Sequence, residues 1–201
     1  FKTNWPRSDV WARIVRAEFA QNFAYFEGKD MKILVTGAKG FVGKNLVAEL
    51  KNIKDGKAKN YPLDPNLTIF EYDVDSAPAE LDEYCRDAEF VFNLAGVNRP
   101  KDAAEFMAGN FGFASVLLET LKKYDNRCPV MISSSTQAAL DNPYGQSKKA
   151  GEDLFFQYGA ETGAKTLVVL PTSESNLHPR ILITENGDSD IKSPLDSHDI
   201  P

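Results

Sequence analysis

The residues of this chain best suited to proton transfer are Tyr144 and Lys148, which stand four positions apart. On a helix, this spacing places both side chains on one face. A phenol ordinarily loses its proton near pH ~10, and a nearby ammonium group lowers that pKa. The pair could therefore exchange a proton near neutral pH. Ser135, the last of three consecutive serines, could hold a carbonyl or alkoxide oxygen beside them.

Other chemistries have little support among the residue types. The two histidines, His178 and His198, lie close to the carboxyl end, so catalysis in the body of the chain must proceed without histidine. The two cysteines form no C-x-x-C pair, which excludes a disulfide framework and a thiolate metal site and predicts a cytoplasmic protein. The formal net charge of −6 argues against nucleic-acid binding. No apolar run reaches the ~18 residues of a membrane span, so we expect no membrane partner.

A glycine-rich turn follows the first apolar run, Lys32–Thr36. Gly37, Gly40 and Gly43 form the pattern G-x-x-G-x-x-G, and apolar residues at helical spacing begin directly after it. At such a junction the first glycine permits a tight turn, the second lets a pyrophosphate approach, and the third lets the helix pack closely on the strand. The dipole of the helix then favours the phosphates. The turn therefore predicts a dinucleotide site.

The elements that must position these residues alternate between strand-like and helix-like segments. We expect strands over 32–36, 67–72, 90–94, 130–133 and 166–170, and helices over 42–53, 78–85, 103–124 and 144–158, with a loop over 55–66. This order predicts an α/β fold, a Rossmann-like doubly wound parallel sheet over 31–170.

The two ends depart from this pattern. Residues 1–30 predict a helix with a rough apolar stripe, which we interpret as an upstream extension, with a docking or dimerisation helix as the alternative. Residues 171–201 contain no aromatic residue and are rich in Pro, Ser, Asp and Asn, which predicts a disordered tail. The strand over 166–170 would then be an exposed sheet edge.

Taken together, these residues resemble the extended short-chain dehydrogenase/reductases, the NAD-dependent epimerase/dehydratase family. The likeness spans about residues 31–170 and rests on four features in the expected order: Thr36–Gly43, Asn93–Gly96, Asn110 and the set Ser135, Tyr144 and Lys148. A narrower likeness, carried by residues 95–100, 133–138 and 141–145, is to the reductase domain of capsular polysaccharide enzymes that form UDP-2-acetamido-2,6-dideoxy-L-talose.

This resemblance implies an NAD(P)-dependent reductase of a 4-keto-6-deoxy nucleotide sugar, with a UDP-linked substrate and a possible homodimer. A 4-epimerase or dehydratase and a non-catalytic dinucleotide-binding module are the alternatives. The substrate-binding lobe of the family would lie after residue 170. We therefore expect the chain to be truncated there and impaired in activity.

The resemblance also implies roles for single residues. Tyr144 would be the proton donor, Lys148 would hold the ribose and tune Tyr144, and Ser135 would steady the substrate oxygen. Asn98 and Arg99 would face the sugar, although Arg99 could equally be a surface arginine. The residues expected to line the cofactor are Gly37, Lys39, Gly40, Phe41, Val42, Gly43, Asp73, Leu94, Ala95, Gly96, Asn110 and Lys148.

The choice between NADP and NAD depends on two opposing signals. Asp73 and Asp75 follow the second strand, where an acid binds the ribose 2′-hydroxyl and disfavours a 2′-phosphate. Lys39 could instead reach a 2′-phosphate, and the capsular reductases that the chain resembles use NADPH. We predict NADP, with NAD as the alternative.

Overall fold

One mixed sheet organises the residues that the computed structural model describes, which are 30–58, 66–98, 100–170 and 180–184. The strand order is β2-β1-β3-β4-β5-β6. The bounds are β1 Met31–Thr36, β2 Leu67–Tyr72, β3 Phe90–Asn93, β4 Val130–Ser133, β5 Thr166–Leu170 and β6 Arg180–Thr184. Strands β1 to β5 are parallel, and β6 pairs antiparallel with β5. The predicted Rossmann-like parallel sheet is confirmed.

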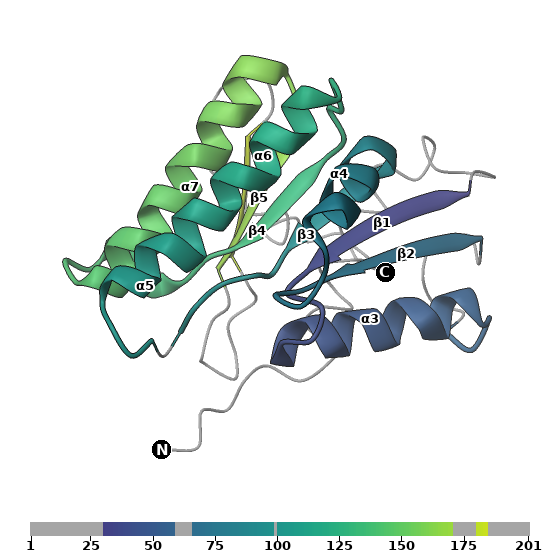
Figure 1. Ribbon diagram of the computed structural model, residues 1–201, viewed down its shortest axis with the longest axis horizontal. Helices are drawn as coiled ribbons and strands as arrows, with labels where there is room; N and C mark the ends of the chain where they lie inside the picture. Colours follow the sequence, from purple (N-terminus) through teal and green to yellow (C-terminus); the bar gives the residue numbers. More distant parts are fainter. Residues whose placement is uncertain (1–29, 59–65, 99, 171–179, 185–201) are drawn as a thin grey trace, which may run out of the picture.

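Helices cover both faces of this sheet (Figure 1). Helix α3 (Phe41–Lys54) packs on one face, where its apolar stripe meets alternate strand residues such as Ile33 and Val35. Helices α4 (Pro78–Asp87), α6 (Phe113–Lys123) and α7 (Pro143–Thr162) pack on the other, against residues such as Leu34. Side chains that alternate along β1 thus enter two separate cores, as the period of a strand requires.

The described chain also contains three short helical segments, α5 (Ala104–Phe106), the π-helix η1 (Met107–Gly112) and a 3₁₀-helix. α5 and η1 lead directly into α6, so the long helix expected over 103–124 contains a π-helical segment. The 3₁₀-helix η2 (Thr136–Ala139) connects β4 to α7. Helix α7 begins with a cap, because the Asn142 side chain accepts a hydrogen bond from the Gly145 amide at 2.8 Å, and Pro143 is its first residue.

Strand β6 corrects the prediction of a wholly disordered carboxyl end. The backbone of Arg180–Thr184 pairs with all five residues of β5, so β5 is not the sheet edge that we expected. The run R-I-L-I-T has strand propensity, but it is short and stands in a segment whose composition is otherwise typical of disorder. The remainder of 171–201 and the helix predicted over 1–30 lie outside the described residues.

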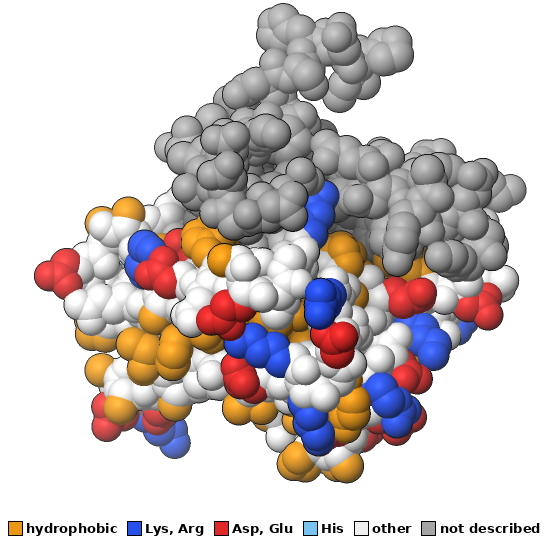
Figure 2. All heavy atoms as spheres, turned by 90° about the horizontal axis from the view of Figure 1, so that it is seen from above, with side chains coloured by type: hydrophobic (Ala, Val, Ile, Leu, Met, Phe, Trp, Pro, Cys, Tyr) orange, Lys and Arg blue, Asp and Glu red, His pale blue; other side chains and the backbone are white. Residues whose placement is uncertain are grey.

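Acidic and basic side chains are interspersed on the face of the molecule seen in Figure 2. Opposite charges also pair between neighbouring helices. Lys122 of α6 contacts Glu161 of α7 at 2.7 Å, and Lys123 of α6 contacts Asp82 of α4 at 2.5 Å. No helix among the described residues is long and apolar enough to cross a bilayer.

Candidate active site

The glycine turn between β1 and α3 leaves no room for a side chain at Gly37 or Gly43. Gly37 has a φ of +67°, and a Cβ atom there would lie 2.7 Å from the Ala95 amide nitrogen. A Cβ atom at Gly43 would lie 2.1 Å from the Gly37 carbonyl oxygen. At Gly40, which begins α3 without a side-chain cap, the same atom would lie 3.1 Å from that oxygen. The turn thus leaves the positive end of the α3 dipole facing an uncrowded approach at Gly40.

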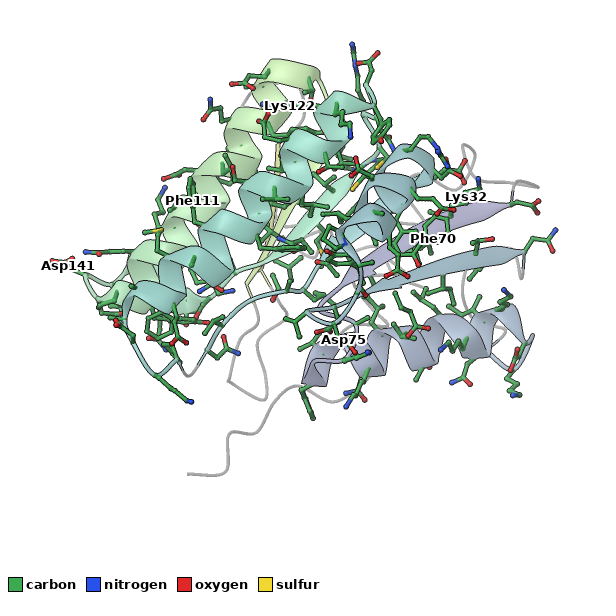
Figure 3. The ribbon with its side chains drawn as sticks, viewed as in Figure 1. Lys32, Phe70, Asp75, Phe111, Lys122 and Asp141 are labelled. Atoms are coloured by element: carbon green, nitrogen blue, oxygen red, sulfur yellow. The ribbon has the colours of Figure 1, made fainter. Side chains whose placement is uncertain are left out.

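The segment after β2 braces this turn. The Asp73 carboxylate accepts a hydrogen bond from the Lys39 amide at 2.7 Å, and the Lys39 ammonium pairs with Asp75. Figure 3 shows Asp75 beside the N-terminal end of α3. The hydrogen bond between the two side chains raises the pKa of Lys39 and lowers that of Asp75. Both side chains are 61% exposed, so the ammonium remains accessible to an anion.

Three other predicted cofactor residues have different surroundings. Phe41 is 67% exposed at the start of α3. Val42 and Leu94 pack against the core on the α3 side of the sheet. Their side chains therefore add apolar surface around the turn, on which a ligand could rest.

The predicted proton-transfer residues meet at the carboxyl ends of β3 and β4. Tyr144 lies in the first turn of α7, and its hydroxyl donates to Asn98 Oδ1 at 3.3 Å. The Lys148 ammonium, 5.8 Å from the centroid of the Tyr144 ring, donates to the Ser133 carbonyl at 3.2 Å. The side chain of Ser135 also lies close enough to the Tyr144 hydroxyl to lower its pKa. Asn98 and Ser135, from two different segments, thus lie at the Tyr144 hydroxyl, and the Lys148 ammonium lies beside the Tyr144 ring.

The electrostatics differ from the expectation that Lys148 lowers the pKa of Tyr144. Burial raises the Tyr144 pKa, and the neighbouring Ser135 side chain only partly offsets this. The ammonium of Lys148 is directed toward the Ser133 carbonyl rather than the phenol oxygen. Burial also lowers the pKa of Lys148 to about 8, against the opposing effect of Glu152. Tyr144 is therefore a protonated phenol at neutral pH, which suits a proton donor.

Asn110 holds the loop after β3 against α7. Its Oδ1 accepts from the Val97 amide at 3.0 Å, while its Nδ2 donates to the Val97 carbonyl at 3.2 Å and to Ser147 Oγ at 2.9 Å. Asn110 lies in the π-helix η1 and is only 4% exposed. Its carboxamide thus bonds to the protein itself and fixes the loop after β3 to α7.

The loop after β3 joins the glycine turn to the proton-transfer residues. Ala95 packs on Gly37, as described above, and Asn98 contacts Tyr144. Between them, a Cβ atom at Gly96 would lie 3.2 Å from the Lys148 ammonium. The glycine turn and the proton-transfer residues are far apart in the sequence, yet residues 95–98 form a continuous wall along both of them. Arg99 lies outside the described residues.

Sequence reasoning missed two buried polar residues beside this wall. Glu152, 7% exposed, accepts a hydrogen bond from the Ser134 hydroxyl, which is itself buried. The only signal available was that Glu152 follows Lys148 by four positions, a spacing more often found on a solvent-exposed helix face.

Residues 33–175 match the model of the NAD dependent epimerase/dehydratase family. The chain belongs to this family. Over 138 residues it is 36% identical to the UDP-2-acetamido-2,6-beta-L-arabino-hexul-4-ose reductase of Pseudomonas aeruginosa, covering 69% of this chain and 34% of the relative. The structure resembles capsular polysaccharide assembling protein CapF of Staphylococcus aureus at 38% identity and a TM-score of 0.55, covering 69% of this chain and 34% of CapF.

A second solved structure, RMD of Pseudomonas aeruginosa complexed with NADPH, is similar at 27% identity and a TM-score of 0.54 and covers 69% of this chain and 52% of RMD. The chain spans about a third of the length of the reductase and of CapF. Membership of the epimerase/dehydratase family supports NAD(P) binding by this chain.

Proposed function

We propose that this domain reduces the 4-keto group of a UDP-linked deoxy sugar for the synthesis of capsular or surface polysaccharide. The observation that carries the proposal is the wall formed by the loop after β3, which brings Gly37 and Tyr144 to one site. A dinucleotide lying along that wall would extend from the glycine turn to the phenol. The similarity to a reductase of a UDP-linked hexulose supports the substrate class.

The residues present fit a nicotinamide dinucleotide. Gly40 and the N-terminus of α3 would hold the pyrophosphate, because only there does the turn leave room and positive potential. Lys148, whose ammonium adjoins Gly96, would hold the ribose. When bound, the dinucleotide supplies the hydride.

The chain's own residues would supply the proton and the orientation. Tyr144 would donate its phenolic proton to the substrate's carbonyl oxygen as negative charge develops there. Ser135 would donate a second hydrogen bond to the same oxygen and so fix its position. The ammonium of Lys148 would stabilise the phenolate that remains. In the free site, the carboxamide oxygen of Asn98 accepts a hydrogen bond from the Tyr144 hydroxyl, so the substrate oxygen would replace Asn98 as the hydrogen-bond acceptor.

For the cofactor we propose NADP. The exposed Lys39 ammonium could exchange its carboxylate partner, Asp75, for a 2′-phosphate. The similar structure that contains NADPH supports this choice. Asp73 is the feature that favours NAD instead, but its carboxylate is engaged by the Lys39 amide.

A labelling experiment tests the proposed reaction. The protein is incubated with a UDP-linked 4-keto-6-deoxy sugar and NADPH that carries deuterium on C4 of the nicotinamide. We expect one deuterium at C4 of the sugar in the product, detected by mass spectrometry and NMR. A 4-epimerase would leave NADPH unconsumed. Tight NADPH binding without any labelled sugar would leave only a dinucleotide-binding module and refute the reductase.

A further inference from the structure

Two successive turns of α7 hold the end of β4 in front of the candidate active site. The ammonium of Lys148 contacts the Ser133 carbonyl at 3.2 Å, and the carboxylate of Glu152 contacts the Ser134 hydroxyl. The next residue is Ser135, whose side chain lies beside the Tyr144 hydroxyl and lowers its pKa. Both α7 side chains are buried, at 8% exposure for Lys148 and 7% for Glu152.

A buried carboxylate needs a compensating interaction, since burial favours its neutral form. Burial raises the pKa of Glu152, whereas Ser134, Lys149 and Lys148 lower it, and Asp153 raises it further. The attraction between Glu152 and Lys148 also favours the charged form of Lys148, whereas burial of the lysine favours its neutral form. Among the described residues, the charged groups that act on this pair lie on α7. The end of β4 contributes the Ser133 carbonyl, and the segment that follows it contributes the Ser134 hydroxyl.

We propose that Glu152 is a positioning residue for the reaction proposed above: it holds Ser134 at the end of β4, and its negative charge maintains Lys148 as an ammonium. The inference rests on the proposed function, because Lys148 must be charged in order to stabilise the phenolate of Tyr144. Glu152 itself touches neither of the atoms that would react. It acts through the lysine one turn before it and through the serine next to Ser135.

A purely structural role for Glu152 would make a different prediction. A carboxylate that only fastens α7 to β4 would change stability when it is removed, but it would leave the titration of Lys148 unchanged. The decisive readout is therefore the pH midpoint of Lys148 itself. That midpoint is measurable by NMR on lysines labelled with ¹³C at Cε, and the Lys148 signal is identified by its absence in Lys148→Met.

Glu152→Gln removes the charge and keeps an amide oxygen that can still accept from Ser134. We expect the Lys148 midpoint to fall by about one to two pH units, because a charge one helical turn away in a buried setting interacts at an effective dielectric constant of ~20. Glu161→Gln is the matched control, since it removes the same charge from the same helix at a side chain that is 44% exposed. It should leave the Lys148 midpoint within ~0.2 units of the wild-type value.

Ser134→Ala separates the hydrogen bond from the charge. It should leave the midpoint of Lys148 near the wild-type value, while amide hydrogen exchange at Ser135 and in η2 becomes faster. If Glu152→Gln fails to fold, Glu152→Asp replaces it; this variant keeps the charge on a shorter side chain, so the midpoint should hold while exchange becomes faster.

An unchanged Lys148 midpoint in Glu152→Gln, an equal shift in Glu161→Gln, or a midpoint displaced by about one unit in Glu152→Asp would overturn the role of the charge. None of these readouts needs catalysis. A protein that shows the Lys148 shift but does not reduce the keto sugar would refute the proposed function and leave the electrostatic link intact.

Discussion

Alanine at Gly43 should mainly reduce stability and alanine at Gly40 should mainly weaken cofactor binding, although both changes add one methyl group to the same turn. A Cβ atom at Gly43 would lie 2.1 Å from the Gly37 carbonyl oxygen, while Cβ contacts below 3.0 Å are essentially never seen. The backbone must therefore move by about 0.9 Å. At Gly40, φ is −67° and the closest atom would lie at 3.1 Å, so the neighbour needs to yield only slightly.

These distances set the expected magnitudes. Overpacking of the kind expected at Gly43 costs about 1–3 kcal/mol of the free energy of unfolding, and the better helix propensity of alanine returns up to ~1 kcal/mol. For a net loss of about 1–2 kcal/mol, Gly43→Ala should lower Tm by about 2–8 °C. Gly40→Ala should change Tm by less than ~2 °C but weaken NADPH binding at least ~10-fold, because its methyl group would stand where the pyrophosphate approaches.

Calorimetry supplies both measurements, with a thermal scan for Tm and a titration with NADPH for Kd. Binding of NADPH by Gly40→Ala as tight as by the wild type would show that the pyrophosphate does not approach the turn at Gly40. If Gly43→Ala unfolds at the wild-type temperature, the contact with Gly37 does not constrain the turn, and the reasoning is refuted.

Three other residues give independent tests. Because burial lowers the pKa of Lys148 from 10.5 to about 8, the folded protein holds fewer protons than the unfolded chain between these values. The free energy of unfolding should therefore rise with pH across that window, by about 3 kcal/mol more than in Lys148→Met. Urea titrations at several pH values measure this difference, and equal pH dependence in both proteins would contradict it. Lys39→Ala should weaken NADPH binding about 10-fold without weakening NADH binding, and parallel losses would remove Lys39 from the 2′-phosphate site. Asn110→Ala should lower the free energy of unfolding by about 1–3 kcal/mol, because the Val97 amide and carbonyl lose their partner. Asn45→Ala, which removes an exposed hydrogen bond, should lower it by under ~1 kcal/mol. Equal losses in chemical denaturation would argue against Asn110 as the residue that holds the loop after β3.

Much of the fold could be predicted because local signals agreed with the tertiary structure. The strand expected over 32–36 is β1 with one more residue, and the strands over 67–72, 130–133 and 166–170 have the predicted bounds. The strands over 32–36, 130–133 and 166–170 are apolar runs bounded by turn residues, and the buried strands of a parallel sheet require little else. The strand over 67–72 lies at the edge of the sheet and is only partly buried. The glycine turn was predictable for the same reason, since its spacing reflects contacts made within the turn itself.

The features that could not be predicted depend on partners distant in the sequence. The π-helical segment at 107–112 contains Asn110, whose partners Val97 and Ser147 come from two other segments. The burial of Glu152 likewise depends on Ser134, a contact that no spacing rule reveals.

The pKa of Tyr144 shows the limit of reasoning from spacing alone. Its four-residue separation from Lys148 correctly predicted that the two side chains are neighbours. The direction of the shift was wrong, because burial of the phenol dominates and the ammonium is bonded to the Ser133 carbonyl. Spacing fixes which residues meet, whereas solvation and hydrogen bonding decide their protonation.

The central claim is that Tyr144 donates a proton during reduction of a UDP-linked 4-keto-6-deoxy sugar. The most direct measurement is a single-turnover assay with enzyme in excess, in which NADPH absorbance is followed for the wild type and for Tyr144→Phe. The account predicts keto-sugar-dependent NADPH oxidation that falls at least ~100-fold in Tyr144→Phe, with Kd for NADPH unchanged within about twofold. Equal rates in the two proteins, or no dependence on the keto sugar in the wild type, would contradict it.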